Sequence, residues 1–202
     1  MARVAVFVDG FNLYHALDGN PTFHKYKWLD LAKLARCFVP HTDKITQVFY
    51  FTAYATWSPG KVEKHKTYVR ALELKGVKPI FGAFRRKDKL CKQCGKTYQT
   101  YEEKQTDVNI AIKLFQTAVA NLYDTAIVVS GDSDLIPALD AIKSTFPDKQ
   151  IVVVIPIGRK AEELKQVAHA HMKLKVKHLE SCQLEDKIQV DNLVLARPPS
   201  WR

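Results

Sequence analysis

The fold is decided near the amino terminus by the stretch VAVFVDGFN, residues 4–12. Its first five residues are all apolar, which is typical of a strand covered by helices on both faces. Asp9 and Gly10 end this apolar run, and Gly10 permits a sharp turn into a following helix. The stretch therefore predicts a central strand of a parallel sheet, with a carboxylate at its carboxyl end.

The same alternation of apolar runs and helical patterns continues along the chain. The predicted strands are residues 4–8, 45–52, 78–84, 125–130, 150–156 and 174–178. The predicted helices are residues 12–17, 28–38, 61–75, 106–120, 133–146 and 161–169. Strands that alternate with helices are the pattern of βαβ units. We therefore expect a doubly wound α/β fold, Rossmann-like, with a mainly parallel sheet of five or six strands and helices on both faces.

Two of these predicted elements carry a more detailed expectation. In the helix at 106–120 the apolar stripe is formed by Val108, Ala111, Ile112 and Phe115. In the strand at 174–178 lysines alternate with apolar residues, which predicts an edge strand with one solvated face. Protection of that edge is favoured over a nucleic-acid stripe as the role of these lysines.

Length and composition restrict the class of protein. A chain of 202 residues with 47% hydrophobic content can bury one substantial core. We predict a domain over residues 1–180 with an insert at 85–104, followed by a tail at 181–202. The net charge of +10 favours a polyanionic partner.

The sequence also bears on location. No secretion signal is recognisable at the start, and the longest apolar stretch, residues 151–157, is far shorter than the roughly 20 residues that span a bilayer. Four cysteines do not make a disulfide scaffold in a chain of this size. We therefore expect a soluble protein of the reducing cytoplasm, without a membrane partner.

Acidic residues follow the predicted strands at one edge of the sheet. Asp9 ends the first strand, Asp132 and Asp134 follow the strand at 125–130, and Asp107 lies in the first turn of the helix before that strand. Ligands of open α/β sheets bind beyond the carboxyl ends of the strands. Clustered carboxylates repel one another unless a cation neutralises them, and hard oxygen ligands suit Mg²⁺ or Mn²⁺. Each acid alone could instead be a cap or turn residue, but all four at this edge favour a metal site.

Three ordered motifs carry a family resemblance: VDGFN at 8–12, EKQTDVN at 103–109 and SGDSDL at 130–135. Together they resemble the NYN domain, in its LabA-like branch, across about residues 2–176. The resemblance implies a PIN-like nuclease fold and a metal-dependent ribonuclease with an acidic pocket. It assigns catalysis and metal binding to Asp9, Asp107, Asp132 and Asp134, with Asn12 and Ser130 as polar supports.

The expected activity is therefore a divalent-metal-dependent endoribonuclease. The basic residues of the insert are candidates for holding RNA phosphates: Arg85, Arg86, Lys87 and Lys89. Phe11, Tyr14 and Trp57 are candidates for stacking a base, with ordinary packing as the alternative. Two other functions remain open: a non-catalytic RNA-binding or regulatory domain, and a hydrolase of a small phosphate ester.

The insert also contains Cys91 and Cys94, which have the spacing of a zinc knuckle. A structural zinc site needs four ligands, and no second pair is visible in the sequence. His41 or His65 could approach, or a symmetric homodimer could supply two copies of the pair. The alternatives are a reducible cysteine pair and a hairpin without metal.

Overall fold

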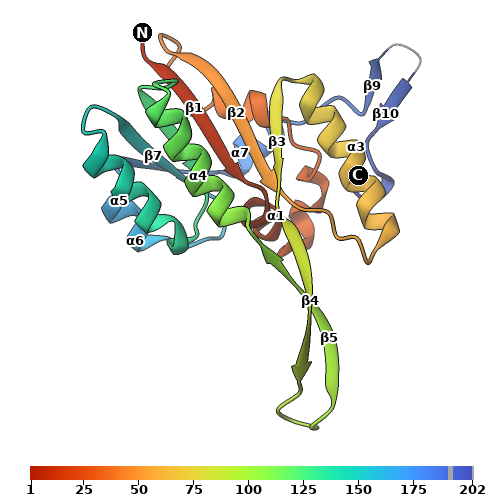
Figure 1. Ribbon diagram of the computed structural model, residues 1–202. Helices are drawn as coiled ribbons and strands as arrows, with labels where there is room; N and C mark the ends of the chain where they lie inside the picture. The colour runs from red at the N-terminus through yellow and green to blue at the C-terminus, as the bar shows by residue number, and fades with distance from the viewer. Residues whose placement is uncertain (191–192, 202) are drawn as a thin grey trace.

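The computed structural model describes residues 1–190 and 193–201 (Figure 1). Its centre is a six-stranded sheet in the order β3-β2-β1-β6-β7-β8, and every neighbouring pair is parallel. The strands are β1 (Arg3–Asp9), β2 (Lys44–Thr52), β3 (Val77–Phe81), β6 (Thr125–Val129), β7 (Gln150–Ile155) and β8 (Ala170–Lys173). The predicted doubly wound α/β class is confirmed.

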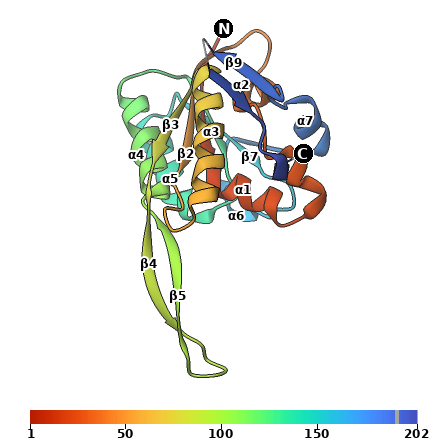
Figure 2. The same ribbon diagram turned by 90° about the vertical axis from the view of Figure 1, so that its right-hand side faces the viewer.

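Helices cover both faces of the sheet (Figure 2). One face carries α4 (Thr106–Val119), α5 (Ile136–Thr145) and α6 (Glu162–Val167), and the other carries α1 (Gly10–Asp18), α2 (Leu31–Arg36), α3 (Pro59–Leu74) and α7 (Val176–Ser181). Alternate residues of β1 point into the two layers, with Phe7 packing under α4 and Val6 under α1 and α2. The apolar run at the amino terminus is therefore buried on both sides.

Three details of the expected fold are wrong. Residues 174–178 are not a strand, because Lys175 caps α7 and the edge strand is β8. In α4 the buried face contains Ile110 and Leu114, whereas Val108 is 59% exposed and Ile112 is 49% exposed. The single strand expected at 78–84 is divided at Gly82, where the backbone passes so close to Lys104 and Thr106 that a Cβ would not fit.

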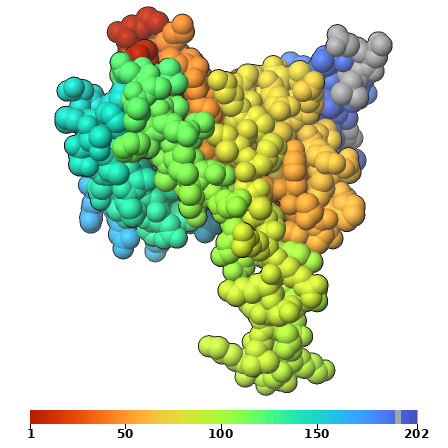
Figure 3. Space-filling view, in the orientation of Figure 1, coloured from red at the N-terminus to blue at the C-terminus, as the bar shows by residue number. Residues whose placement is uncertain are grey.

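The insert forms a two-stranded antiparallel hairpin of β4 (Ala83–Leu90) and β5 (Thr97–Lys104). Figures 1 and 3 show it projecting from the body of the molecule as an arm, close to the start of α4. The hairpin root is held against the domain by Trp57, whose ring stacks on Tyr101 at 3.8 Å and meets the edge of Phe84 at 4.6 Å. The arm thus begins next to the carboxyl edge of the sheet.

The described part of the carboxyl-terminal segment is structured. It contains β9 (Lys187–Val190), β10 (Leu193–Ala196) and the 3-10 turn η3 (Pro199–Trp201). The other 3-10 turns are η1 (Pro21–Tyr26) and η2 (Ser133–Leu135). Trp201 packs against Trp28 and Tyr68, with ring centroids 6.3 and 5.8 Å away. This contact attaches the chain end to the face that carries α3.

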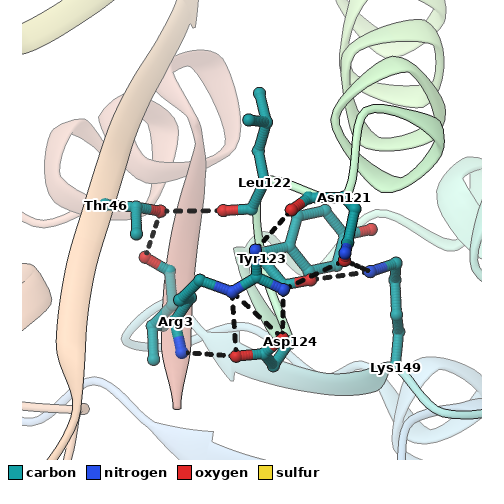
Figure 4. Close-up of polar contacts among 8 residues, drawn as sticks. Arg3, Thr46, Asn121, Leu122, Tyr123, Asp124 and Lys149 are labelled. Carbon is teal, nitrogen blue, oxygen red and sulfur yellow. Dashed lines mark hydrogen bonds and ion pairs between the residues drawn. The ribbon is translucent and has the colours of Figure 1, made fainter. Parts of the chain in front are cut away.

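The opposite, amino-terminal edge of the sheet is tied by a polar network (Figure 4). The Arg3 guanidinium donates to the Asp124 carboxylate and to the Asn121 carbonyl, and Lys149 Nζ donates to the Tyr123 carbonyl at 2.7 Å. The Arg3 hydrogen bonds lower the pKa of Asp124 to about 2. These contacts give this edge a structural role. Among the described helices none is long and apolar enough to cross a membrane.

Candidate functional site

The candidate site lies where the strand order reverses, between the carboxyl ends of β1 and β6. Asp9 ends β1 and is also the N-cap of α1, with its Oδ1 accepting from the Asn12 amide at 2.9 Å. Ser130 follows β6 directly and is buried, and its Oγ donates to Asp9 Oδ2 at 2.7 Å. The buried Asp9 carboxylate is therefore fixed in place by two donors from different segments.

The turn after β6 is fastened to the same residues. Asn12 Oδ1 accepts from the Gly131 amide at 3.0 Å, and Ser130 Oγ accepts from the Asp132 amide at 3.1 Å. Asp132 in turn caps η2, accepting from the Asp134 amide at 3.1 Å. Asn12 and Ser130 thus have the supporting position expected of them, although their roles in function stay predictions.

The pKa of Asp107 shows most clearly that these acids interact electrostatically. Asp107 lies half-buried in the first turn of α4, and its pKa is raised to about 6. Burial is the largest cause, followed by the charges of Asp9, Asp132, Glu103 and Asp134. Burial also raises the pKa of Asp9, against the opposing effect of its hydrogen bonds from Asn12 and Ser130. The charges of Asp9, Asp132 and Asp134 therefore act on Asp107 across this edge of the sheet.

The sequence prediction missed Glu103 as a member of this cluster. Glu103 ends the hairpin on β5, its Oε1 accepts from the Thr106 amide at 3.0 Å and from the Thr106 hydroxyl, and its charge raises the pKa of both Asp9 and Asp107. Its place at the start of the second motif was the available signal, but only the folded hairpin places it beside α4.

A second residue that the prediction missed is Arg159, in the loop after β7. Its side chain passes so close to the turn after β6 that a Cβ on Gly131 would lie 3.2 Å from Arg159 Cβ. Arg159 itself is exposed. An exposed arginine side chain therefore starts beside the turn that leads to Asp132, and a guanidinium is well suited to hold a phosphate.

The donor set fits a hard divalent cation, since the acids at this edge offer carboxylate oxygens whose charges repel one another. Within residues 1–190 and 193–201, no three His, Cys, Asp or Glu side chains already converge tightly enough to hold an ion. A metal would therefore have to draw the carboxylates of Asp9, Asp107, Asp132 and Asp134 together.

The four basic residues predicted to hold RNA are all exposed on β4. Side chains alternate between the faces of a strand, so Arg85, Lys87 and Lys89 share one face of the hairpin and Arg86 the other. Lys87 and Lys89 pair with Glu102 at 3.2 Å, whereas Arg86 lies opposite Tyr101, on the face that meets Trp57. Only Arg86 lies on the face that carries Glu103.

Cys91 and Cys94 lie at the tip of the hairpin, where the Gly95 amide donates to the Cys91 carbonyl at 2.9 Å. Hydrogen bonds from the backbone at Cys94 and Gln93 lower the pKa of the Cys91 thiol. No third ligand from the described part of the chain joins the pair, because His65 is bonded to Thr52 at 3.1 Å and His41 follows α2. A complete zinc site within one chain is therefore not present among these residues.

The three aromatic residues predicted to stack a base, Phe11, Tyr14 and Trp57, all line one cavity of about 570 Å³. This cavity lies beside the acidic cluster, since Gly10 and Phe11 line it while Asp9 and Asn12 belong to the cluster. Their packing therefore leaves accessible aromatic surface next to the acids.

A parallel, doubly wound sheet with carboxylates at its switch point is the architecture of PIN-like nucleases. The family model of the NYN domain matches residues 3–175, and the chain belongs to this family, whose members are usually nucleases. Divalent-metal dependence is general among NYN nucleases.

Two relatives extend this comparison. The chain is 26% identical, over 246 aligned positions, to 6-hydroxy-3-succinoylpyridine 3-monooxygenase HspA from Pseudomonas putida, covering 98% of this chain and 75% of HspA. It also resembles the crystal structure of a protein of unknown function from Vibrio parahaemolyticus, with a TM-score of 0.61 and 17% identity over 91% of this chain and 96% of that one. The second likeness shows the fold alone.

Proposed function

We propose that the protein is a divalent-metal-dependent endoribonuclease of the cytoplasm. The observation that carries this proposal is the meeting of acids from three chain-distant segments, close enough that their charges help to raise the pKa of Asp107 to about 6. Such repulsion costs folding free energy, and a structure keeps it where a cation is to be bound. The order and content of the three motifs further support a place in the LabA-like branch.

In this proposal Asp9, Asp107, Asp132 and Asp134 hold Mg²⁺ or Mn²⁺. When bound, the metal would lower the pKa of a water molecule and neutralise charge on the scissile phosphate. Hydrogen bonds from Ser130 to the Asp9 carboxylate and from the Gly131 amide to Asn12 hold that carboxylate and the turn after β6 in position. Arg159, which starts beside the turn after β6, and Arg86, on the hairpin face that carries Glu103, would orient the phosphodiester for in-line attack.

The two alternatives from the sequence account for less of the structure. A regulatory domain without turnover needs no set of mutually repelling acids. A small phosphate ester needs neither the net charge of +10 nor the basic arm. A polymeric anion uses both, because phosphate contacts along a strand add up.

The hairpin tip could bind zinc only with ligands from outside the described chain. The thiols of Cys91, partly exposed, and Cys94, exposed, lie on a projecting arm and suit a site shared with a second copy, where two pairs would supply four thiolates. We include this homodimeric zinc site in the proposal as a structural feature, separate from the acidic cluster.

A second candidate function is oxidation of a heteroaromatic acid, as the name of HspA states for that protein. The aromatic-lined cavity next to the acids favours it, since a hydroxypyridine ring would find stacking partners there.

One experiment separates these functions. The purified protein is incubated with labelled single-stranded RNA, matched DNA, p-nitrophenyl phosphate and 6-hydroxy-3-succinoylpyridine with NADH, in Mg²⁺, Mn²⁺ or EDTA. We expect cleavage of RNA only, abolished by EDTA. RNA that stays intact under all metal conditions would reject the ribonuclease, and turnover of the pyridine would establish the second candidate.

A further inference from the structure

The cavity beside the acidic cluster is a concave feature of the described chain that the proposed mechanism does not use. Its volume of about 570 Å³ lies within the range of small-molecule sites. Figure 2 shows α1 and α3 on the same face of the sheet, and the cavity lies between them, closed by the hairpin root and by Trp201. Residues from several segments that are distant in the chain therefore line it.

The first turn of α1 separates the cavity from the acids. Asp9 and Asn12 face the cluster, whereas Gly10, Phe11 and Tyr14 line the cavity. The turn is seated tightly on β2, because a Cβ on Gly10 would lie 2.4 Å from the Phe51 carbonyl oxygen and would also meet the Tyr50 ring. Only glycine allows this approach. Because residues of the same first turn face both sites, the cavity and the acidic cluster lie within one helical turn of each other.

One wall of the cavity is aromatic and partly open. Trp57 is 39% exposed and Tyr14 is 38% exposed. The stack of Trp57 on Tyr101 and the edge contacts of Phe84 with Trp57 and Phe11 hold this wall in a fixed arrangement. Rigid aromatic surfaces of this kind stack nucleobases regardless of sequence.

The polar groups of the cavity suit a base that carries a phosphate. Lys61 and Lys64 lie in the first turns of α3 with exposed side chains, and Lys64 Nζ donates to Ser200 Oγ at 3.0 Å. Deeper in the cavity His65 is paired with Thr52, and burial lowers the His65 pKa to about 4, so its ring is neutral at pH 7. A neutral imidazole and a hydroxyl can pair with the edge of an uncharged base, while the lysines attract an anion.

We propose that this cavity binds a single unstacked nucleotide of the RNA substrate, with its base against Trp57 and Tyr14 and its phosphate at Lys61 and Lys64. Sequence-tolerant recognition of RNA commonly uses a base turned out of the strand and stacked on aromatic rings. The neighbouring phosphodiester would then reach the acids on the other side of the first turn of α1. This inference rests on the proposed function, because it takes RNA as the substrate.

The test measures mononucleotide binding in EDTA, so that it does not depend on cleavage. Calorimetric titrations use UMP, AMP and the corresponding nucleosides with the full chain. We expect Trp57→Ala to weaken the binding of UMP and AMP by about tenfold or more. A Lys61→Ala, Lys64→Ala double variant should weaken the binding of the nucleotides but leave the binding of the nucleosides unchanged. The matched control is Tyr98→Ala, which removes a 52% exposed aromatic ring of the same hairpin outside the cavity.

Because Trp57 also holds the hairpin root, Tyr14→Ala is the second variant, and circular dichroism checks that both are folded. Wild-type protein that cleaves RNA but binds neither UMP nor AMP would overturn the cavity assignment and leave the ribonuclease standing. Nucleotide binding that depends on Trp57 and Tyr14 without any RNA cleavage would support the cavity and defeat the ribonuclease. Nucleotide binding unaffected by either variant, or binding of 6-hydroxy-3-succinoylpyridine alone, would overturn the proposal.

Discussion

The repulsion among the acids predicts that the metal-free protein becomes more stable when one of them is neutralised. Asp107 titrates in the folded protein at about 6, compared with an ordinary value of 3.8. Its raised pKa means that the folded state binds the proton more tightly than the unfolded chain does. The contribution of Asp107 to stability is therefore most favourable below about pH 4, is lost as the pH rises through 6, and stays lower above that value.

The size of the effect follows from this shift. At about 1.4 kcal/mol for each pKa unit the shift would correspond to roughly 3 kcal/mol at pH 7, which we reduce to about 1–2 kcal/mol because Asp107 is half exposed. Replacing Asp107 by Asn also loses a favourable charge in the first turn of α4, about 0.5 kcal/mol. We expect Asp107→Asn to raise the unfolding free energy at pH 7 by about 1 kcal/mol, or the melting temperature by about 2–4 °C.

The assay is chemical denaturation in EDTA at pH 4, 5.5 and 7.5. The matched control is Asp124→Asn, which makes the same change in a carboxylate whose pKa is lowered to about 2 by Arg3. Asp124 contributes stability above about pH 4 that is lost as the pH falls toward 2, so this control should destabilise the protein at pH 7.5. A loss of stability in Asp107→Asn, or a gain of the same size at all three pH values, would refute the reasoning.

Three further predictions concern the hairpin and the start of α1. The Arg85→Ala, Arg86→Ala double variant should weaken RNA binding and reduce its salt slope by about one to two, with Arg86 contributing more; an unchanged slope would leave both as solvated surface. If the hairpin tip binds zinc, Cys91→Ser should abolish the zinc content measured by elemental analysis and lower RNA cleavage. The unfolding free energy should change by less than about 0.5 kcal/mol, because the tip lies outside the core. Wild-type protein without zinc, together with a fully active variant, would reject the site. Gly10→Ala should cost about 1–3 kcal/mol in denaturation, because its Cβ would meet the Phe51 backbone at 2.4 Å, and unaltered stability would contradict the close seating of α1.

The central strands and their acids could be predicted because the information is local. An apolar run followed by Asp9 and Gly10 specifies a buried strand, a turn and a carboxylate at the carboxyl edge, whatever the rest of the chain does. The same holds for the turn that follows β6. Connecting these segments required only the rule that parallel strands share an edge.

The orientation of α4 could not be predicted in this way. The helix carries two apolar stripes. Val108 and Ile112 are spaced four residues apart, and so are Ile110 and Leu114, so helical periodicity does not decide which stripe is buried. Only packing on the sheet selects the second. The prediction of an edge strand at 174–178 was wrong for a related reason. Lys175 and Lys177 alternate with apolar residues as in a strand, yet they belong to the cap and first turn of α7.

The residues missed at the site depend on tertiary structure. Glu103 reaches the cluster because β4 and β5 pair and return the chain to Gly82, and Arg159 reaches it because the loop after β7 crosses Gly131. Glu103 lies on the antiparallel hairpin, and Arg159 lies four residues beyond the end of β7 rather than directly at it. A search restricted to strand ends therefore finds the acids but not their neighbours.

The central claim is that Asp132 and its partners form a metal-dependent cleavage site, and the most direct measurement is single-turnover cleavage of end-labelled RNA across a Mn²⁺ titration. Wild-type protein is compared with Asp132→Asn and with Asp140→Asn, a matched change at an exposed position of α5. We predict that Asp132→Asn lowers the cleavage rate at least about 100-fold with its fold intact, while Asp140→Asn cleaves normally. Wild-type cleavage by Asp132→Asn, or cleavage by the wild-type protein that persists in EDTA, would contradict the assignment.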